Sequence, residues 1–284
     1  MSANQELYVL DHASTAQSEL NRLDSVHNAY TRYFGNRLSF APLELSDPKE
    51  ILEIGSGGGA WAIAAATRFP GASVTAIDQH PLPPRPLPPN LKFVEHDIVQ
   101  PLPFARAKFD VVHCRLVMLH IPNAEERLQH IAEFVKPGGW LLVEDPDDYI
   151  PDAHDNYGVA HTTALVRELH VIMRGTGANP CIGSDLERIL LASNAFSEVN
   201  VRRTVIPFPH DPATVESNAP PEQHLGVAWR QSYIDVARGL EEKYPTRVTA
   251  TILKQFLDDL DNPHTVSTST MYFTWSRRKH HSEL

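Results

Sequence analysis

The stretch of sequence that decides the fold runs from Glu50 to Pro70 and reads EILEIGSGGGAWAIAAATRFP. Its glycine-rich part, GSGGGA at residues 55–60, follows a short apolar run and satisfies the pattern G-x-G-x-x-G/A, which is typical of a dinucleotide-binding turn between a strand and a helix. The pattern alone does not identify the ligand. The residues around the turn must therefore decide between a dinucleotide and a molecule that carries no phosphate.

Short apolar runs of the same kind recur beyond this turn. Each has the length and the β-branched content of a buried strand, and glycine, Pro-Gly or aspartate separates it from the next. Together with residues 51–54, they are residues 73–78, 91–97, 109–114 and 140–145. Because strands that alternate with crossovers pair in parallel, the sequence predicts an α/β fold with a doubly wound, mostly parallel sheet and helices on both faces.

One crossover differs from the others. Residues 80–90 read HPLPPRPLPPN and contain six prolines, which remove the amide donors that a helix requires. We expect a stiff, extended connector at this edge of the sheet. The alternative is a ligand for a proline-recognition domain, but PxxP patterns are common and carry little specificity.

Further segments flank this strand pattern. Residues 16–40 carry apolar side chains at a spacing of three and four, which predicts an amphipathic helix. Residues 198–208 and 269–278 alternate like strands, and the stretch between them is mainly helical and too long for a hairpin loop. We therefore expect three parts: an N-terminal helical cap (1–45), a Rossmann-like core (46–209 and 265–284) and a helical lid that holds the acceptor (210–264).

The composition argues against several classes of protein. With 42% hydrophobic and 21% charged residues among 284, it is ordinary for a globular domain with additions. No run approaches the roughly 18 apolar residues of a membrane span, and the N-terminus lacks signal-peptide features, so we expect a cytoplasmic protein without a membrane partner. A formal net charge of -10 disfavours nucleic acid as a partner. Cys114 and Cys181 form no C-x-x-C pair and support neither a disulfide framework nor zinc.

Three carboxylates terminate three successive expected strands. Glu53 lies two residues before Gly55, Asp78 ends the second strand, and Asp97 ends the third beside apolar Ile98. Ligands of α/β sheets bind at such carboxyl ends, and a carboxylate near a pyrophosphate is repelled by several kcal/mol at an effective dielectric constant of about 20. We therefore expect a cationic ligand, with a ribose at Asp78 and an adenine amino group at Asp97.

In their order and spacing, these motifs resemble those of the class I S-adenosylmethionine-dependent methyltransferases. LEIGSGGG matches the cofactor loop, Asp78 the ribose acid, HDI (96–98) the adenine motif and VKPGGWLLVED (135–145) the turn into the fifth strand. A closer likeness is to fungal small-molecule methyltransferases related to the secondary-metabolism regulators. That likeness is carried by ELNRLDSVHNAY (19–30), PPNLKF (88–93) and IGSDLERILLASNAF (182–196).

The resemblance implies a fold, a cofactor and a set of contacts. The fold is a seven-stranded sheet, parallel except for its last strand, and the cofactor is S-adenosyl-L-methionine. The implied cofactor-binding residues are Glu53, Gly55, Ser56, Gly57, Asp78, Gln79, Asp97, Ile98, Arg115, Leu116 and Arg22. Backbone groups of Arg115 and Leu116 are expected to hold the methionine end. In the first helix, Val26 stands where the family often has glutamine, and its neighbours Arg22 and His27 are candidates for cofactor or acceptor contacts.

The resemblance also implies a reaction, which is methyl transfer to a small-molecule acceptor in secondary metabolism. We expect the methylated atom to be a hydroxyl or carboxylate oxygen, and nitrogen and sulfur stay open as alternatives. His120 is the candidate catalytic residue, because it follows the fourth strand where it would face the methyl group. The alternative is that His120 only caps the turn before Pro122. Arg115, Arg174 and Arg230 are candidate anchors for an anionic acceptor.

Other functions stay open. The acidic run Glu144, Asp145, Asp147 and Asp148 is a candidate Mg²⁺ site, but Arg115 stands where metal-dependent methyltransferases need an acidic ligand, so we expect no metal. A regulator that keeps the cofactor fold without catalysis and an NAD-dependent oxidoreductase are the competing functions. Trp229 and Tyr233, expected to be exposed on the lid, leave a homodimer interface as an alternative to a pocket.

Overall fold

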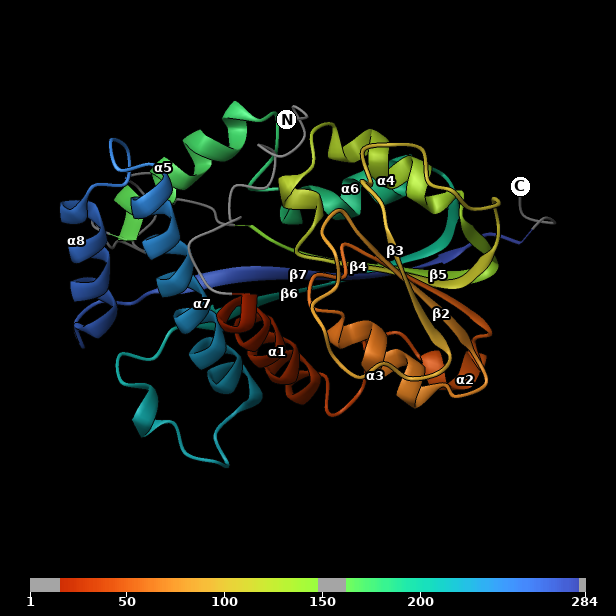
Figure 1. Ribbon diagram of the computed structural model, residues 1–284, viewed down its shortest axis with the longest axis horizontal. Coiled ribbons are helices and arrows are strands. Elements are labelled where there is room, and N and C mark those ends of the chain that lie inside the picture. Colours follow the sequence, from red (N-terminus) through yellow and green to blue (C-terminus); the bar gives the residue numbers. More distant parts are fainter. Residues whose placement is uncertain (1–15, 148–161, 281–284) are drawn as a thin grey trace.

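Seven strands form one mixed sheet in the order β3-β2-β1-β4-β5-β7-β6 (Figure 1). The computed structural model describes residues 16–147 and 162–280. The strands are β1 (Glu50–Ile54), β2 (Ser73–Asp78), β3 (Leu91–Glu95), β4 (Phe109–Arg115), β5 (Val135–Pro146), β6 (Phe196–Pro207) and β7 (Thr268–Arg278). The pairs among β1 to β5 are parallel, whereas β7 runs antiparallel to both β5 and β6. This confirms the expected doubly wound, mostly parallel sheet.

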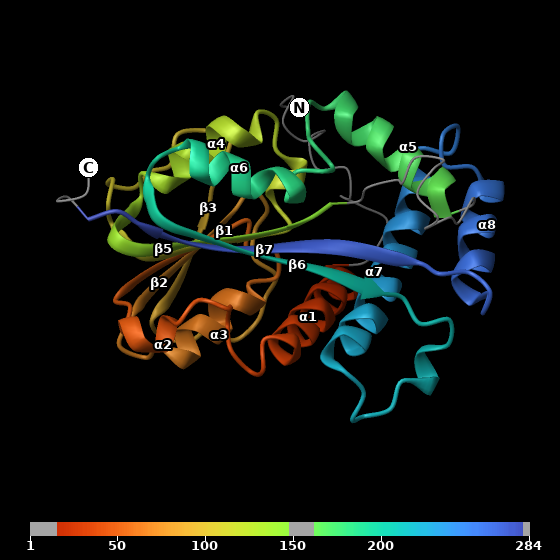
Figure 2. The same ribbon diagram turned by 180° about the vertical axis from the view of Figure 1, so that it is seen from behind.

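Helices cover both faces of this sheet, as the opposite views of Figures 1 and 2 show. α1, α2 and α3 lie on one side and α4 and α6 on the other, while α5, α7 and α8 gather at one end. α7 packs against α1 and β6, and α8 packs against α5 and α7. The bounds are α1 (Ala16–Tyr33), α2 (Leu43–Ser46), α3 (Ala60–Arg68), α4 (Ala124–Ala132), α5 (Thr162–Gly175), α6 (Leu186–Ala192), α7 (Pro221–Lys243) and α8 (Ala250–Asp261), with 3-10 turns η2 (Met118–His120), η3 (Gly183–Asp185) and η4 (Pro212–Thr214).

Side chains that alternate along the central strands divide the core between the two faces. On β1, Leu52 and Ile54 belong to one buried apolar cluster, whereas Ile51 belongs to a second cluster that includes Leu43 of α2 and Trp61 of α3. Successive residues of a strand point to opposite faces. A strand covered on both sides is therefore apolar throughout, which is why the strands could be recognised as short continuous runs.

The N-terminal helix is shorter than the expected span of residues 16–40. α1 ends at Tyr33, and the two residues Gly35 and Asn36 that follow adopt φ values of 66° and 62°. The amide of Asn36 donates to the Thr31 carbonyl at 2.8 Å, so a left-handed turn ends the helix. Gly35 and Asn36 are the residue types that favour such an ending.

The carboxyl ends of the parallel strands meet at one edge of the sheet, where the chain turns sharply. Gly55 follows β1 with a φ of 66°, and Leu116 follows β4 with a φ of 57°. The third strand ends earlier than expected, at Glu95, so Asp97 lies in the loop beyond it. The candidate site is built along this edge.

Candidate active site

A cavity of about 590 Å³ lies at the carboxyl edge of the sheet, between the ends of β1, β2 and β4 and the helices α1, α5 and α7. All twelve residues that the sequence nominated for catalysis or cofactor binding line this cavity. They are Arg22, Glu53, Gly55, Ser56, Gly57, Asp78, Gln79, Asp97, Ile98, Arg115, Leu116 and His120. The structure brings them together, and their individual roles stay predictions.

The amides of the glycine loop (55–59) are largely satisfied within the protein. Ser56 N donates to Ile77 O at 3.0 Å, Gly59 N donates to Ser56 O at 2.8 Å, and Gly57 N donates to Asp78 Oδ2 at 2.8 Å. A pyrophosphate on such a loop would need these donors. The arrangement therefore argues against a dinucleotide.

The first helix also covers this loop. A Cβ atom added at Gly58 would lie 2.8 Å from Leu20 Cδ1, and one at Gly57 would lie 3.2 Å from Leu23 Cδ1. These apolar side chains of α1 occupy the space beside the loop where a charged phosphate would need solvation or donors. The ligand that fits here presents no phosphate.

The carboxylates of Asp78 and Asp97 are held in place but keep acceptor capacity. Asp78 accepts from the amides of Gly57 and His80, at 2.8 and 3.0 Å, and Asp97 accepts from Val99 N at 2.9 Å. An ionised carboxylate has about four lone-pair sites. The remaining acceptor sites of Asp78 suit the two hydroxyl groups of a ribose. Asp97, beside buried Ile98, suits the amino group of an adenine. These side chains therefore fit an adenosyl cofactor.

Glu53 does not present the open negative charge that its position suggested. Its side chain is buried, and Oε2 accepts from Ala62 N at 2.9 Å, near the start of α3. A carboxylate is stabilised at a helix N-terminus by the free amides and the helix dipole. Glu53 therefore lines the cavity, but one of its carboxylate oxygens is bonded to the start of the helix that follows the glycine loop.

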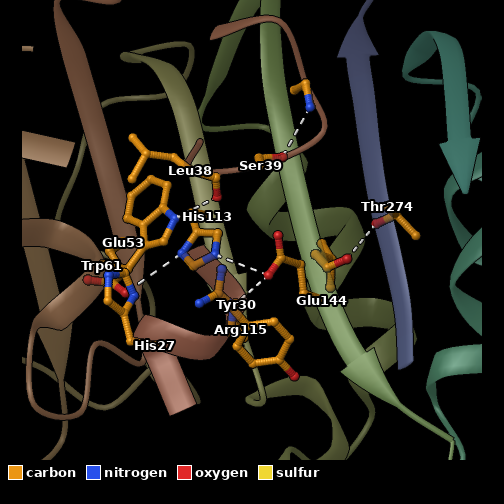
Figure 3. A network of polar contacts seen from close by, with 12 residues as sticks. His27, Tyr30, Leu38, Ser39, Glu53, Trp61, His113, Arg115, Glu144 and Thr274 are labelled. Carbon is orange, nitrogen blue, oxygen red and sulfur yellow. Dashed lines mark hydrogen bonds and ion pairs between the residues drawn. The ribbon is translucent and has the colours of Figure 1, made fainter. Parts of the chain in front are cut away.

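A row of charged side chains crosses the sheet beneath the cavity (Figure 3). The ring of buried His113 lies between two carboxylates, with Nδ1 3.7 Å from Glu53 Oε1 and Nε2 3.8 Å from Glu144 Oε2. Arg115 donates through Nε to Glu144, and its guanidinium lies 4.4 Å from the ring centroid of Tyr30. Burial alone would raise the pKa of Glu144, but Arg115 and His113 lower it. The row was not recognised from the sequence.

His27 faces the same end of the cavity from α1. Burial, aided by Arg115 and His113, lowers its pKa to about 3, so the imidazole is neutral at physiological pH. Its Nδ1 is buried without a hydrogen-bond partner among the described residues. Together with the Arg115 guanidinium, this nitrogen is placed to meet a polar end of a ligand.

The other half of the cavity is apolar and aromatic. It is lined by Leu169, Met173, Trp229, Tyr233 and Val236, from α5 and α7. The expectation that Trp229 is exposed was wrong, because its side chain packs against α1 and its Nε1 donates to Tyr30 Oη at 3.1 Å. The aromatic lid helix is therefore part of the cavity wall.

His120, and Arg22 with its partner Glu19, are charged or titratable groups that border this apolar half. Burial, with a smaller contribution from Arg22, lowers the pKa of His120 to about 4, so the ring is neutral at physiological pH. Arg22 donates to both carboxylate oxygens of Glu19, at 2.8 and 2.6 Å, and to Ser232 Oγ at 2.7 Å. Arg22 therefore links α1 to α7 and has its charge balanced.

The acidic run on β5 is not arranged as a metal centre. Glu144 pairs with Arg115, and Asp145 Oδ1 accepts from Leu119 N at 3.2 Å. Asp148 lies outside the described residues. Within residues 16–147 and 162–280, no group of three or more His, Cys, Asp or Glu side chains is placed to hold a metal ion.

The other nominated arginines lie outside the cavity wall. Arg174 is exposed, and Arg230 pairs with Asp261 on α8. Neither lines the cavity. Among the described helices, none has the length and apolar character to cross a membrane.

Comparison with known proteins identifies the likeness. A family model described as "Methyltransferase domain" matches residues 26–195. Methyltransferase str2 of Strobilurus tenacellus is 43% identical over 218 residues, which cover 75% of this chain and 76% of the relative. The secondary metabolism regulator LAE1 of Cochliobolus heterostrophus is 27% identical over 232 residues, 79% of this chain and 72% of the relative. The crystal structure of the Bacillus subtilis YcgJ protein shares the fold, with a TM-score of 0.51, 15% identity and coverage of 93% of this chain and 99% of that one.

Proposed function

The chain belongs to the methyltransferase domain family, whose methyl donor is S-adenosylmethionine, and from this premise we propose that it methylates a hydroxyl group on a small, uncharged, aromatic or apolar acceptor. The observation that carries the acceptor class is the apolar half of the cavity, where neutral His120 lies beside aromatic and aliphatic side chains from α5 and α7.

The charges around that half favour a hydroxyl over a carboxylate. Arg22, the cation that borders it, already binds the Glu19 carboxylate through two nitrogens and Ser232 through the third. A second carboxylate would have to displace this pair or enter an apolar wall without a partner, which is costly. An uncharged acceptor meets neither cost.

When bound, S-adenosylmethionine supplies an electrophilic methyl group. The residues of this chain align the acceptor and exclude water, for which roughly 7 to 11 kcal/mol of barrier reduction is available. Trp229 and Tyr233 supply flat surfaces against which an aromatic acceptor can stack.

His120 accepts the proton of the acceptor hydroxyl in this proposal. A pKa of about 4 makes His120 a weak base, but the hydroxyl becomes far more acidic as its oxygen forms the new bond, so a weak base is sufficient. Such a base adds about a hundredfold to ten-thousandfold to the rate. The proton then passes from the imidazole to solvent.

The cofactor site is tested by calorimetry with S-adenosylhomocysteine. Asp78→Ala should weaken binding at least tenfold, about 1.4 kcal/mol, because a ribose contact is lost. Asp258→Ala is the matched control, since Asp258 is exposed on α8 and pairs with Lys254. Absence of binding by the unmodified protein would overturn the proposal.

The acceptor class is tested by incubation with isotopically labelled cofactor and paired acceptors, such as a phenol and the benzoate of the same size, with mass detection. Methylation of phenols and not of benzoates is expected. Preferential methylation of carboxylates would contradict the proposed acceptor.

A regulator without turnover is the second candidate, favoured by the likeness to LAE1. Tight cofactor binding without any methylated product from a broad extract would support it. The same extract experiment decides between the two functions.

A further inference from the structure

The proline-rich connector, residues 80–90, forms no helix, as expected, and has two distinct sides. Leu82, Pro83, Arg85 and Pro88 are half-buried, whereas Pro84, Pro86, Leu87 and Pro89 are exposed. Prolines fix φ and stiffen an extended chain. The connector therefore has an inward side, formed by the half-buried residues, and an outward side, formed by the exposed ones.

The inward side of this connector lies over the glycine loop. A Cβ atom added at Gly59 would lie 2.9 Å from Leu82 Cδ1, and one at Gly58 would lie 3.5 Å from Arg85 Nη1. His80, Pro81 and Pro83 line the cavity beside Asp78. The connector is thus a wall of the cavity on the ribose side.

Arg85 fastens the connector to two other elements. Its Nη1 and Nη2 donate to Asp24 Oδ1 and Oδ2 of α1, at 3.0 and 3.1 Å, and Nη1 also donates to Gly58 O of the glycine loop at 2.6 Å. The side chains of Arg85 and Asp24 are 19% and 32% exposed, so solvent screens this pair only in part. Two parallel bonds to one carboxylate fix orientation as well as distance.

These bonds act on the residues that cover the glycine loop. Asp24 is next to Leu23 and one helical turn from Leu20, whose side chains lie against Gly57 and Gly58. Arg85 therefore joins α1, the glycine loop and the connector at one point. Its hydrogen bonds go to Asp24 and Gly58, which lie outside the acceptor half of the cavity.

We propose that Arg85, through its bidentate pair with Asp24 and its bond to Gly58 O, is a positioning residue that holds the glycine loop, α1 and the proline connector in the arrangement that binds the cofactor. The inference rests on the proposed function. Without the pair, the loop and its cover separate more readily, and the cofactor is released faster. The acceptor half changes less, because Leu169, Met173, Trp229, Tyr233 and Val236 of its wall come from α5 and α7, which make no hydrogen bond to Arg85 among those described.

The test measures the binding of S-adenosylhomocysteine by calorimetry and its release by stopped-flow fluorescence. Arg85→Ala should raise the Kd about tenfold, mostly through a faster release. Arg85→Lys should raise it by a smaller factor, because an ammonium keeps the charge and loses the bidentate geometry. Asp24→Asn should give an effect between those two, and Asp24→Asn with Arg85→Ala should be no worse than Arg85→Ala alone.

Steady-state kinetics give a second readout. The KM for the cofactor should rise in Arg85→Ala, while kcat and the KM for the acceptor change less than twofold. Arg68 ends α3 and makes a more exposed single ion pair with Glu44 of α2, and neither residue lines the cavity. Arg68→Ala is the matched control. It should leave all constants unchanged.

Hydrogen exchange of the protein without ligand tests the mechanism directly. The glycine-loop amides of Arg85→Ala should exchange at least fivefold faster than those of the unmodified protein, with unchanged exchange in β5. If the unmodified protein binds and Arg85→Ala and Asp24→Asn bind within twofold of it, this inference is wrong and the proposed function stands. If the unmodified protein does not bind at all, the proposed function itself fails.

Discussion

The Trp61 indole lies flat against the His113 imidazole, with ring centroids 3.8 Å apart and planes inclined by 9°. Trp61 belongs to the helix that follows the glycine loop, and its Nε1 donates to Leu38 O at 3.2 Å. His113 belongs to β4 and lies between the carboxylates of Glu53 and Glu144. The stacked pair therefore connects the glycine loop to the charged row beneath the cavity.

Replacing His113 by alanine should be strongly destabilising. It leaves Glu53 and Glu144 facing each other across a void, and removing a buried polar partner from carboxylates costs up to about 3 to 5 kcal/mol. Urea unfolding measures the loss. His130→Ala is the control, since His130 forms a half-exposed pair with Glu133 and should change the unfolding free energy by about 1 kcal/mol or less. Equal effects of the two substitutions would contradict the role given to the row.

Gly55→Ala should destabilise the protein and weaken cofactor binding. The φ of 66° is unfavourable for a side chain, and the added Cβ would lie 2.4 Å from Val117 Cγ2. The backbone term alone is about 1 to 2 kcal/mol. Adding Val117→Ala to this variant should restore the stability that is lost through the clash. The loss that comes from the unfavourable φ should remain. Thermal unfolding of Gly55→Ala, Val117→Ala and the double variant checks this, and a double variant no more stable than Gly55→Ala alone would count against the clash.

His120→Gln should lower kcat by about a hundredfold to ten-thousandfold and leave the binding of S-adenosylhomocysteine within twofold. The lowered pKa, about 4, predicts that the rate of the unmodified protein does not fall with His120 protonation until the pH drops below about 5. Rapid-quench measurements between pH 5 and 8 test both points. A rate that is unchanged by the substitution would return His120 to a structural role in the turn before Pro122.

The buried histidines should make the fold less stable in acid. The pKa values of His27 and His120 are lowered from 6.5 to about 3 and about 4, because burial disfavours the imidazolium. Between these values and 6.5 the unfolded chain binds more protons than the folded chain, so stability is complete above pH 6.5 and declines as the pH falls. The slope for one such group is at most about 1.4 kcal/mol per pH unit. Thermal unfolding at pH 7 and pH 5 should show a smaller difference for His27→Gln than for the unmodified protein.

Asp145→Asn should stabilise the protein in base. Burial raises the pKa of Asp145 to about 8, against backbone donors at Leu119, Met118 and Val117. A raised pKa means that the stability contributed by the bound proton is present at low pH and is lost as the pH rises through about 8. The melting temperature of Asp145→Asn should exceed that of the unmodified protein at pH 9 and approach it at pH 5. A lower melting temperature at pH 9 would contradict the assignment.

The strands and the ligand-binding edge could be predicted because they depend on local pattern. Each buried strand is a short apolar run, and the residues that follow it must lie at the carboxyl edge. For this reason, Glu53, Asp78 and Asp97 were expected at one place and are found there. The family likeness then added Arg115 and Leu116, and these also line the cavity.

The long-range pairs could not be predicted in this way. Arg85 and Asp24 are 61 positions apart, and Tyr30 and Trp229 are 199 apart, so no sequence window contains both partners. The burial of Trp229 did leave a local signal, because the apolar residues Leu225, Ala228 and Trp229 stand three and four positions apart along α7. The charged row could not be recognised because Glu53 and Glu144 lie on different strands. His113 stands within the mostly apolar run of residues 109–114, which predicts only a buried strand.

The position of β7 has a consequence for how the protein is made. β5 and β6 are consecutive along the chain but not in the sheet, because β7, which is synthesised after α7 and α8, lies between them. Until β7 emerges from the ribosome, β5 has an unpaired edge and β6 has no partner in the sheet, and unpaired strand edges are prone to aggregate. Chaperones that shield strand edges should therefore act on this chain between the synthesis of β6 and that of β7, while α7 and α8 are being made.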